Sequence, residues 1–306
     1  MDSFLNWIDK VEKASAGRIK IKYLGGPDAL SPLELPDHCQ KGTIDLFHTS
    51  PAYYTKTLPE SEVIHFIRPE DQRSDWLRGS GFFDLYNEAL ISRKGIMLLA
   101  SVGPRHDALL FSNKPITSDD WTRFKIRVPG PLVGTFLSSM GSTPTVVSNP
   151  EVLEALGRGI IDGQLRPPQD AYRNKEYEYT AYCLGPTFVS YFTGIFINKK
   201  KWDGIPKDLK QVIMKETIQL EKHYDVYWPN IVAEAVKEMS QGKLVKYSQL
   251  SPEQFGKVSK AWKTSWDKEL SPNLLPGYST KFEKILEGHA TWGKFYPTFL
   301  SKYVSK

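Results

Sequence analysis

RFKIRVPGP, residues 123–131, is the stretch of sequence that decides the fold. Its apolar and charged residues alternate and then meet a Pro-Gly turn, which predicts a strand that ends at residue 128. Residues 18–23 (RIKIKY) show the same alternation, and a Gly-Gly-Pro turn follows at residues 25–27. This internal echo is the first indication of two similar units.

A second echo follows in the same order along the chain. Residues 158–162 (RGIID) match residues 41–45 (KGTID). In both places a basic residue and a helix-stopping glycine lead directly into a predicted strand. Two matches in one order predict two lobes of similar build, each an α/β unit with parallel strands.

The remaining periodic segments fill in both units. Helical spacing and stop signals predict helices over Ser3–Ala16 and Leu33–Gln40, and apolar runs predict strands over Thr43–Phe47 and Gly95–Val102. Two further helix starts are marked by Asn149-Pro150-Glu151, with Asn149 as the N-cap, and by a capping box at Ser251–Gln254.

Two long segments are suited to joining the lobes. Phe188–Asn198 is an aromatic and β-branched run that is long enough for a strand crossing from one lobe to the other. Pro206–Gln241 has helical spacing but contains Pro229. A single kinked helix across both lobes and two ordinary helices broken at Trp228-Pro229 both fit this pattern.

Composition narrows the class of protein. The chain has 306 residues, 40% of them hydrophobic and 25% charged, with a net charge of +5 and no dense run of Lys and Arg. This charge pattern does not indicate a nucleic-acid partner, and the mild positive excess favours an anionic ligand. No apolar stretch reaches transmembrane length, and if the protein is exported, its signal peptide lies outside this chain.

Signals for catalysis, metals and cofactors are weak. The six histidines and two cysteines show no metal-ligand spacing, and Cys39 and Cys183 are far apart, which favours free thiols. We expect no cofactor and no metal. No Gly-x-Ser-x-Gly or His-Glu-x-x-His motif is found, and the scattered carboxylates single out no acid/base pair, so we do not expect an enzyme.

Four segments in order resemble one known family. Residues 114–130, 151–164, 197–206 and 250–253 resemble the DctP-type solute-binding proteins of tripartite ATP-independent periplasmic (TRAP) transporters. In order and spacing, the resemblance covers nearly the whole chain. It implies a two-lobed periplasmic-binding-protein fold, α/β in class, with hinge strands and a long helix spanning both lobes.

The resemblance also implies lobe boundaries. Residues 1–104 with about 193–232 form the first lobe, and residues 105–192 with about 233–306 form the second, with the C-terminal helices packed around both. In this family a strand usually precedes the first helix. Because a helix is predicted almost from Met1, we expect the first lobe to lack a strand.

The function implied is capture of a small organic carboxylate in the cleft between the lobes. A periplasmic receptor would then deliver this ligand to a TRAP membrane permease. Two rivals stay open. One is a cytoplasmic ligand-sensing domain of a regulator with the same two-lobed fold, and the other is an enzyme on a two-lobed scaffold.

Arg127 is the predicted anchor for the ligand carboxylate. In the family, an arginine at this place in the Lys-Ile-Arg-Val-Pro segment pairs with the ligand, and a guanidinium matches a carboxylate through two parallel hydrogen bonds. A second arginine often assists, and Arg105 is the best match. Arg166 stands where the family often has asparagine. If all three arginines face the cleft, the ligand should be a di-anion or a carboxylate with further polar groups.

Other candidates come from both lobes. The segment after Asp45 offers aromatic rings and hydroxyl groups to the cleft, and the long strand offers one of two neighbouring rings. Two amide side chains that precede Arg166 in the sequence complete the candidate set. These residues are Phe47, His48, Thr49, Ser50 and Tyr53, then Tyr191 or Phe192, and finally Asn149 and Gln164.

Overall fold

The computed structural model describes residues 2–54, 56–68, 73–102, 106–116, 118–128 and 130–291. Within these ranges the strands form two separate sheets, one of three strands in the order β1-β8-β2 and one of six in the order β5-β4-β6-β3-β7-β9. The strands are β1 (Leu46–Thr49), β2 (Ile96–Ser101), β3 (His106–Ser112), β4 (Lys125–Val128), β5 (Thr143–Val146), β6 (Gly163–Arg166), β7 (Tyr182–Tyr191), β8 (Gly194–Asn198) and β9 (Lys246–Gln249).

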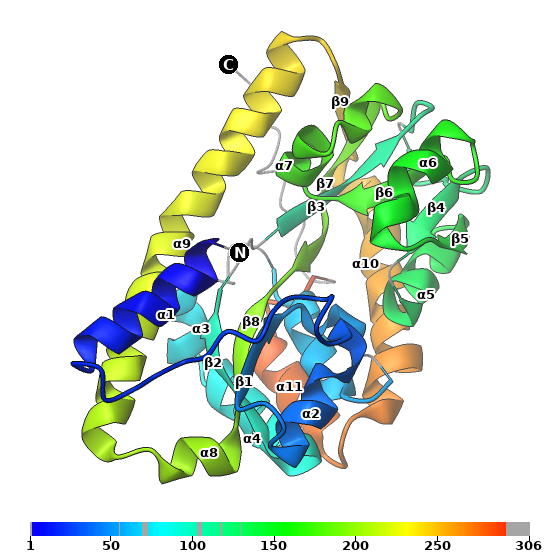
Figure 1. Ribbon diagram of the computed structural model, residues 1–306. Helices are drawn as coiled ribbons and strands as arrows, with labels where there is room; N and C mark the ends of the chain where they lie inside the picture. Colours follow the sequence, from blue (N-terminus) through cyan, green and yellow to red (C-terminus); the bar gives the residue numbers. More distant parts are fainter. Residues whose placement is uncertain are drawn as a thin grey trace.

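Helices surround both sheets and one of them runs past both (Figure 1). The α-helices are α1 (Asp2–Ala14), α2 (Leu35–Lys41), α3 (Ser74–Gly79), α4 (Phe82–Lys94), α5 (Pro131–Ser139), α6 (Val152–Gly157), α7 (Pro168–Arg173), α8 (Lys199–Gly204), α9 (Lys207–Gln241), α10 (Pro252–Ser265) and α11 (Tyr278–Leu286). Short 3-10 turns are η1 (Pro32–Glu34), η2 (Pro51–Tyr53), η3 (Pro59–Phe66), η5 (Asn149–Glu151), η6 (Glu176–Glu178) and η8 (Ser271–Asn273), and η7 (Trp266–Leu270) is a π-helical turn.

The strand directions differ between the two sheets. In the three-stranded sheet, β8 pairs antiparallel with both β1 and β2. The six-stranded sheet is mixed, with β4 parallel to β5 and β6, and with β3 antiparallel to β6 and β7. The prediction of parallel strands is therefore correct for β4 and its neighbours and wrong for the three-stranded sheet. The reason is that β8 enters that sheet from the other lobe, against the direction of β1 and β2.

The chain passes between the sheets along β2 to β3 and again along β7 to β8. The predicted crossing strand is confirmed, although it divides into β7 and β8 around Phe192 and Thr193. The two passages are bonded where they meet. The Val102 amide donates to the carbonyl of Thr193 at 3.0 Å, and the Thr193 hydroxyl donates to the carbonyl of Val102.

The long helix α9 is the third connection. It is continuous over 35 residues with Pro229 inside it, so the reading as two broken helices is wrong. Its first half packs in the core beside the small sheet, and its second half packs in the core beside the large sheet. The buried residues are Ile213, Leu220 and Tyr224 in the first half, and Val232, Val236 and Met239 in the second.

Several local predictions are confirmed. Gly42 ends α2 in the left-handed conformation with φ 77°, and Gly159 follows α6 with φ 66°, as the repeated glycine pattern requires. The capping box at Ser251 and Gln254 is also present. By contrast, the cap of the turn that begins at Asn149 is Ser148, so the N-cap prediction was wrong by one residue.

The predicted strand over residues 18–23 is absent from both sheets, which corrects the sequence reading. Two of its amides bond instead to side chains in and just after α1: Ile19 donates to the Ser15 hydroxyl at 3.1 Å and Ile21 to the Glu12 carboxylate at 2.7 Å. Ile19 and Ile21 still pack on the hydrophobic core, which explains the alternating pattern. The first echo therefore reflects a shared burial pattern and not a shared strand.

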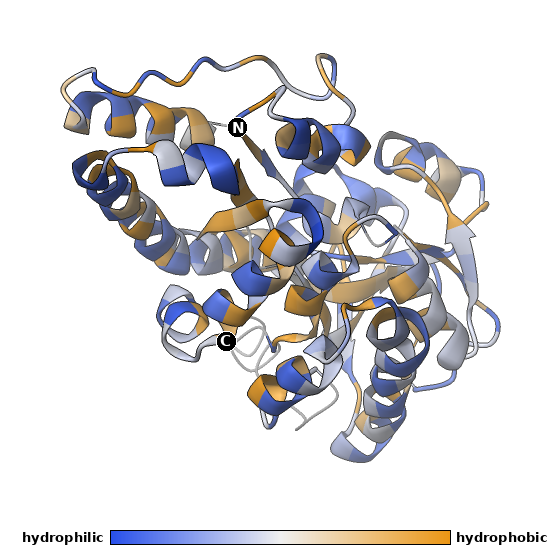
Figure 2. Ribbon diagram, turned by 90° about the horizontal axis from the view of Figure 1, so that it is seen from below, coloured by the Kyte–Doolittle hydropathy of each residue, from blue (hydrophilic) through white to orange (hydrophobic). Residues whose placement is uncertain are grey.

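Hydrophobic residues concentrate on the strands at the centre of the molecule, while the surrounding helices also carry many hydrophilic residues (Figure 2). Both cysteines are buried free thiols, and burial raises the pKa of Cys39 to about 12. Among the described residues, no helix is both long enough and apolar enough to cross a membrane.

The buried carboxylate of Glu221 bonds α9 to the end of β2 in the three-stranded sheet. Glu221 is 0% exposed and accepts from Arg78 Nε at 2.6 Å, from Arg78 Nη2 at 3.0 Å and from the Ser101 amide at 2.8 Å. Arg78 Nη2 also donates to the carbonyl of Leu99. Helix α9 is thereby bonded to α3 and to β2.

Glu221→Gln should lower the free energy of unfolding by about 3 kcal/mol, because it leaves the Arg78 guanidinium without its buried counter-charge. Glu234→Gln, an exposed position on the same helix, should change it by less than about 0.5 kcal/mol. Urea unfolding of the two variants measures the difference. Equal midpoints would show that the Glu221 pair does not hold α9 in place.

Candidate functional site

Arg127 lies on β4 between two parallel neighbours, with Thr145 of β5 and Gln164 of β6 opposite it. The side chain is partly buried, and its Nε donates to the carbonyl of Val147 at 3.0 Å. Among the described residues, no carboxylate lies within ion-pair distance of this guanidinium. Burial lowers the pKa of Arg127, and the nearby Arg166 charge lowers it further. The guanidinium is thus partly desolvated, and the part of the chain that the structure describes offers it no counter-ion.

Arg166 lies on the adjacent strand β6, two residues after Gln164 and on the same face of the sheet. It is 8% exposed and forms a two-point ion pair with Glu176, through Nε at 3.0 Å and Nη2 at 2.8 Å. Arg166 Nη1 also donates to Asn149 Oδ1 at 2.9 Å, and Gln164 Nε2 donates to Glu176 at 2.8 Å. Gln164, Arg166, Glu176 and Asn149 therefore form one polar cluster beside Arg127.

This cluster corrects the charge count made from the sequence. Arg166 was expected to make the cleft more cationic, but Glu176 supplies the opposing charge. The sequence gives no sign of this pair, because Glu176 lies ten residues away in the turn η6. Burial raises the pKa of Glu176, and the Arg166 charge opposes that rise. With Arg166 neutralised, the argument from three free arginines to a di-anionic ligand no longer applies.

Tyr191, at the end of β7, lies near Arg127, and its ring meets His65 of the opposite lobe. Its hydroxyl is buried and has no hydrogen-bond partner among the described residues. Burial raises the pKa of Tyr191, while the Arg127 and Arg166 charges oppose this rise. Its neighbour Phe192 is 2% exposed and packs in the core. Of these two rings, the structure places Tyr191 toward the cleft.

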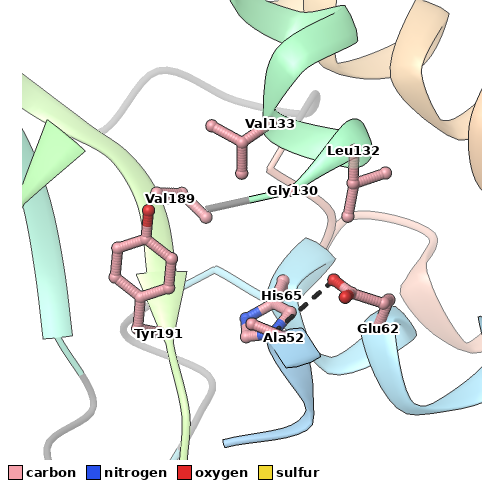
Figure 3. A pocket seen from close by; sticks show the side chains of 8 residues that line it. All are labelled: Ala52, Glu62, His65, Gly130, Leu132, Val133, Val189 and Tyr191. Atoms are coloured by element: carbon pink, nitrogen blue, oxygen red, sulfur yellow. Dashed lines mark ion pairs between the residues drawn. The ribbon is translucent and has the colours of Figure 1, made fainter. Parts of the chain in front are cut away.

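A small pocket, partly open to solvent, lies between the two lobes. One wall comes from turns that precede β2 and the other from β7 and the start of α5 (Figure 3). We call it the cleft pocket; its lining residues are Ala52, Glu62 and His65 on the first wall and Gly130, Leu132, Val133, Val189 and Tyr191 on the second. Arg127 is not a lining residue, and it adjoins the pocket through Tyr191 and the end of β4.

Residues predicted after Asp45 fall into different places. Phe47 is 5% exposed and stacks on Phe196 with ring centroids 5.1 Å apart, so we leave it out of the proposed site. Thr49 is buried at the end of β1. Ser50 caps η2, where its hydroxyl accepts from the Ala52 amide of the pocket wall at 3.4 Å.

Three further candidates complete the comparison with the sequence. Tyr53 is 50% exposed, and its hydroxyl is close enough to influence the pKa of Arg127. His48 stacks on Phe4, and burial lowers the pKa of His48 to about 4, so its ring serves local packing. Arg105 lies outside the described residues and stays a prediction.

Sequence reasoning missed Glu62 and His65, two buried polar residues of the pocket wall. They lie in η3, a turn whose residues are all buried, and His65 Nε2 is 3.8 Å from Glu62 Oε2. No motif marks this segment. The available signal was the group of apolar residues beside them, Val63, Ile64, Phe66 and Ile67, which favours a buried segment.

The site has the chemistry of binding. In the described structure, a partly buried cation has no counter-ion, a buried hydroxyl has no hydrogen-bond partner, and several apolar side chains lie nearby. Such groups can hold a small anion with an apolar body. Within the described residues, no group of three His, Cys, Asp or Glu side chains could hold a metal ion.

A two-lobed α/β fold with a pocket between its lobes is found in solute-binding proteins. The model of the DctP family, described as bacterial extracellular solute-binding protein, family 7, matches residues 1–272. The chain belongs to this family. The family consists of extracytoplasmic transport proteins and is not a family of enzymes.

Individual relatives are distant. The chain is 25% identical over 200 residues to the ectoine/5-hydroxyectoine-binding periplasmic protein UehA of Ruegeria pomeroyi, covering 63% of this chain and 59% of that one. It is 25% identical over 253 residues to a monocarboxylate 2-oxoacid-binding periplasmic protein of Nostoc sp., covering 78% and 68%. The first match thus spans less than two thirds of the relative's own length.

A solved structure shows the same fold. The TRAP periplasmic solute-binding protein of Desulfovibrio salexigens, with bound orotic acid, superposes with a TM-score of 0.80 at 16% identity. The superposition covers 94% of this chain and 93% of that chain. The two-lobed α/β architecture predicted from the sequence is confirmed.

Arg166→Met should destabilise the protein by about 3 kcal/mol at neutral pH, because it leaves the buried Glu176 carboxylate unpaired. Arg127→Met should cost only about 1 kcal/mol, the loss of one hydrogen bond to Val147. Denaturant unfolding compares the two. Equal losses would contradict the assignment of Arg166 as structural and Arg127 as unpaired.

The Arg166→Met loss should shrink as the pH falls. Burial already raises the pKa of Glu176 above its ordinary value of 4.5, and removal of Arg166 raises it further. At a pH between 4.5 and the raised pKa of Glu176, the native variant binds more protons than the unfolded chain. Its free energy of unfolding therefore rises on acidification. Unfolding between about pH 7 and pH 5 measures this, and a loss that grows toward pH 5 would contradict it.

Proposed function

We propose that this protein is a periplasmic solute-binding protein that captures a small organic carboxylate in the cleft pocket and delivers it to a TRAP membrane permease. Arg127 pairs with the ligand carboxylate. Family membership supports solute binding and an extracytoplasmic location. The carboxylate, the permease and the role of each residue are our proposal.

The observation that carries this proposal is the missing counter-ion of Arg127. A desolvated guanidinium is costly unless an anion compensates it. The neighbouring Arg166 already has Glu176, whereas Arg127 has only the carbonyl of Val147 among the described residues. An incoming carboxylate would supply the missing charge through two parallel hydrogen bonds.

Capture would use closure of the lobes. The first lobe, residues 1–104 with about 193–232, supplies Ala52, Glu62 and His65, and the second, residues 105–192 with about 233–306, supplies the other wall. A ligand that contacts both walls stabilises the closed state over the open one. The two bonded crossing strands and α9 are the segments about which the lobes would move.

The similar proteins named above do not favour the rival reading as a cytoplasmic ligand-sensing domain. They are described as periplasmic binding proteins. An enzyme would need a reacting group beside the ligand. The residues described around Arg127 offer an anion site and a packing surface, which suit reversible binding.

Arg127→Met should remove most of the stabilisation by the ligand. A panel of small mono- and dicarboxylates, including 2-oxoacids, is tested by thermal shift. At about a hundred times the dissociation constant, a bound acid should raise the melting temperature of the wild type by about 5 °C. The variant should lose about a hundredfold in affinity, because a charge pair is removed.

Arg123→Met is the matched control. Arg123 is an exposed arginine just before β4, so this variant should respond to acids as the wild type does. If Arg127→Met and Arg123→Met bound the acids with equal affinity, Arg127 would not be the anchor.

A further inference from the structure

Arg166 lies at the edge of the sheet where an anion would bind. Arg127 of β4 lies opposite Gln164 of the parallel strand β6, and Arg166 is the last residue of β6. Ligands of open α/β sheets bind beyond the carboxyl ends of their parallel strands. By its position alone, Arg166 is therefore as well placed for a ligand carboxylate as Arg127.

Glu176 withdraws Arg166 from this role. Its carboxylate is 2% exposed and accepts from Arg166 Nε at 3.0 Å and from Nη2 at 2.8 Å. A guanidinium and a carboxylate joined through two parallel hydrogen bonds satisfy each other in charge and in geometry. Asn149 accepts from the remaining nitrogen, Arg166 Nη1, at 2.9 Å. The pair is therefore a neutral unit beside Arg127.

Among the residues that the structure describes, one positive charge is left over in this group. Asp170 lies close enough for the Arg166 charge to act on its pKa, which burial raises, and it pairs with Arg173 at 3.2 Å. Arg166 is paired with Glu176, so each of these two acids has an arginine of its own. Burial and then the nearby Arg166 charge lower the pKa of Arg127, but no described carboxylate pairs with it. The group is thus suited to one ligand carboxylate.

The cleft pocket adds no further positive charge. Its described lining residues contain no Lys or Arg, and its one acid, Glu62, has His65 at 3.8 Å. The rest of the lining, apart from Tyr191, has no polar side chain (Figure 3). Its apolar side chains are those of Ala52, Leu132, Val133 and Val189. A second ligand carboxylate would be desolvated here without a partner, which is costly.

We propose that Glu176 sets the charge of the ligand: by neutralising Arg166 it leaves Arg127 as the anchor, and the protein selects monocarboxylates with a small apolar body over dicarboxylates. This inference rests on the proposed function, because it assumes that Arg127 binds a carboxylate. Glu176 acts on specificity through Arg166, without touching the ligand. A dicarboxylate would need Arg166 as its second cation, and Glu176 already occupies that guanidinium.

Loss of the Glu176 charge should reverse this selection. Glu176→Gln keeps the shape of the side chain, so Arg166 stays in place but becomes a second uncompensated cation. Burial raises the pKa of the Tyr191 hydroxyl, and the Arg127 and Arg166 charges both oppose that rise, so both arginines lie near this wall of the pocket. A dicarboxylate could then meet one guanidinium with each end, whereas a monocarboxylate would leave one of them unpaired.

Acids that differ only in a terminal methyl or carboxylate group test the inference. Butyrate is compared with succinate, and pentanoate with glutarate, by calorimetric titration at about pH 8, where unperturbed carboxyl groups are ionised and an unperturbed imidazole is neutral. The wild type should bind each monocarboxylate tighter than the matching dicarboxylate by about tenfold or more. Glu176→Gln should reduce that ratio by about tenfold or more, because a second cation is exposed to the ligand.

Glu178→Gln is the matched control. Glu178 is an exposed acid in the same turn, η6, so this variant should keep the wild-type ratio. Wild-type protein that binds succinate or glutarate as tightly as the monocarboxylates would overturn the inference. An unchanged ratio in Glu176→Gln would overturn it as well.

A double variant, Arg166→Met with Glu176→Leu, separates the effect of charge from the effect of a damaged fold. Glu176→Gln also takes away a buried counter-charge, whereas the double variant removes both charges together, which proteins tolerate better. Arg127 is then again the one unpaired cation of the group, so the double variant should keep the wild-type preference for monocarboxylates. If it preferred dicarboxylates, the free charge of Arg166 could not be the cause, and the inference would be wrong.

The titrations also distinguish this inference from the proposed function. If Arg127→Met binds every acid as the wild type does, the proposed function fails together with the inference. If Arg127→Met loses binding but Glu176→Gln keeps the wild-type ratio, the anchor stands and only the assignment of Glu176 is wrong.

Discussion

The site depends on a difference between two neighbouring arginines. Arg166 and Arg127 lie on adjacent strands of one sheet, but only Arg166 has an acid in the described structure, Glu176. The first is a closed ion pair that holds the end of β6, and its removal would leave a buried charge. The second is a partly desolvated cation that has no counter-ion among the described residues, and we propose that the ligand supplies one. In this proposal, the charge beside a pocket between two lobes is what binds the ligand.

The architecture places that charge where closure can use it. Three segments join the lobes, β2 to β3, β7 to β8, and α9, and the first two are bonded to each other between Val102 and Thr193. Glu221 of α9 is bonded to the amide of Ser101, beside the first crossing. Tyr191, at the end of β7, lies both next to a crossing and on the pocket wall. We propose that ligand contact at Tyr191 acts on the segments about which the lobes would move.

Features that depend on one short segment could be predicted from the sequence. Contacts between residues that lie in different segments could not. The position of Arg127 before a Pro-Gly turn, the crossing run that became β7 and β8, and the glycine stops at Gly42 and Gly159 depend on local spacing, and the structure has all of them. The partner of Arg166 and the acid of the pocket wall depend on how turns fold back onto the sheet, which local spacing does not encode. For residues 18–23 the local pattern was misleading. The segment alternates like a strand because one side of it is buried, but the Ile19 and Ile21 amides bond to side chains and not to another strand.

A crystal structure of the wild-type protein with the most stabilising acid of the panel tests the central claim most directly. The account predicts closed lobes, with the ligand carboxylate in the cleft pocket and its oxygens within hydrogen-bonding distance of the Arg127 guanidinium. A ligand bound in the cleft with its carboxylate paired elsewhere, and Arg127 still bonded only to the carbonyl of Val147, would contradict it.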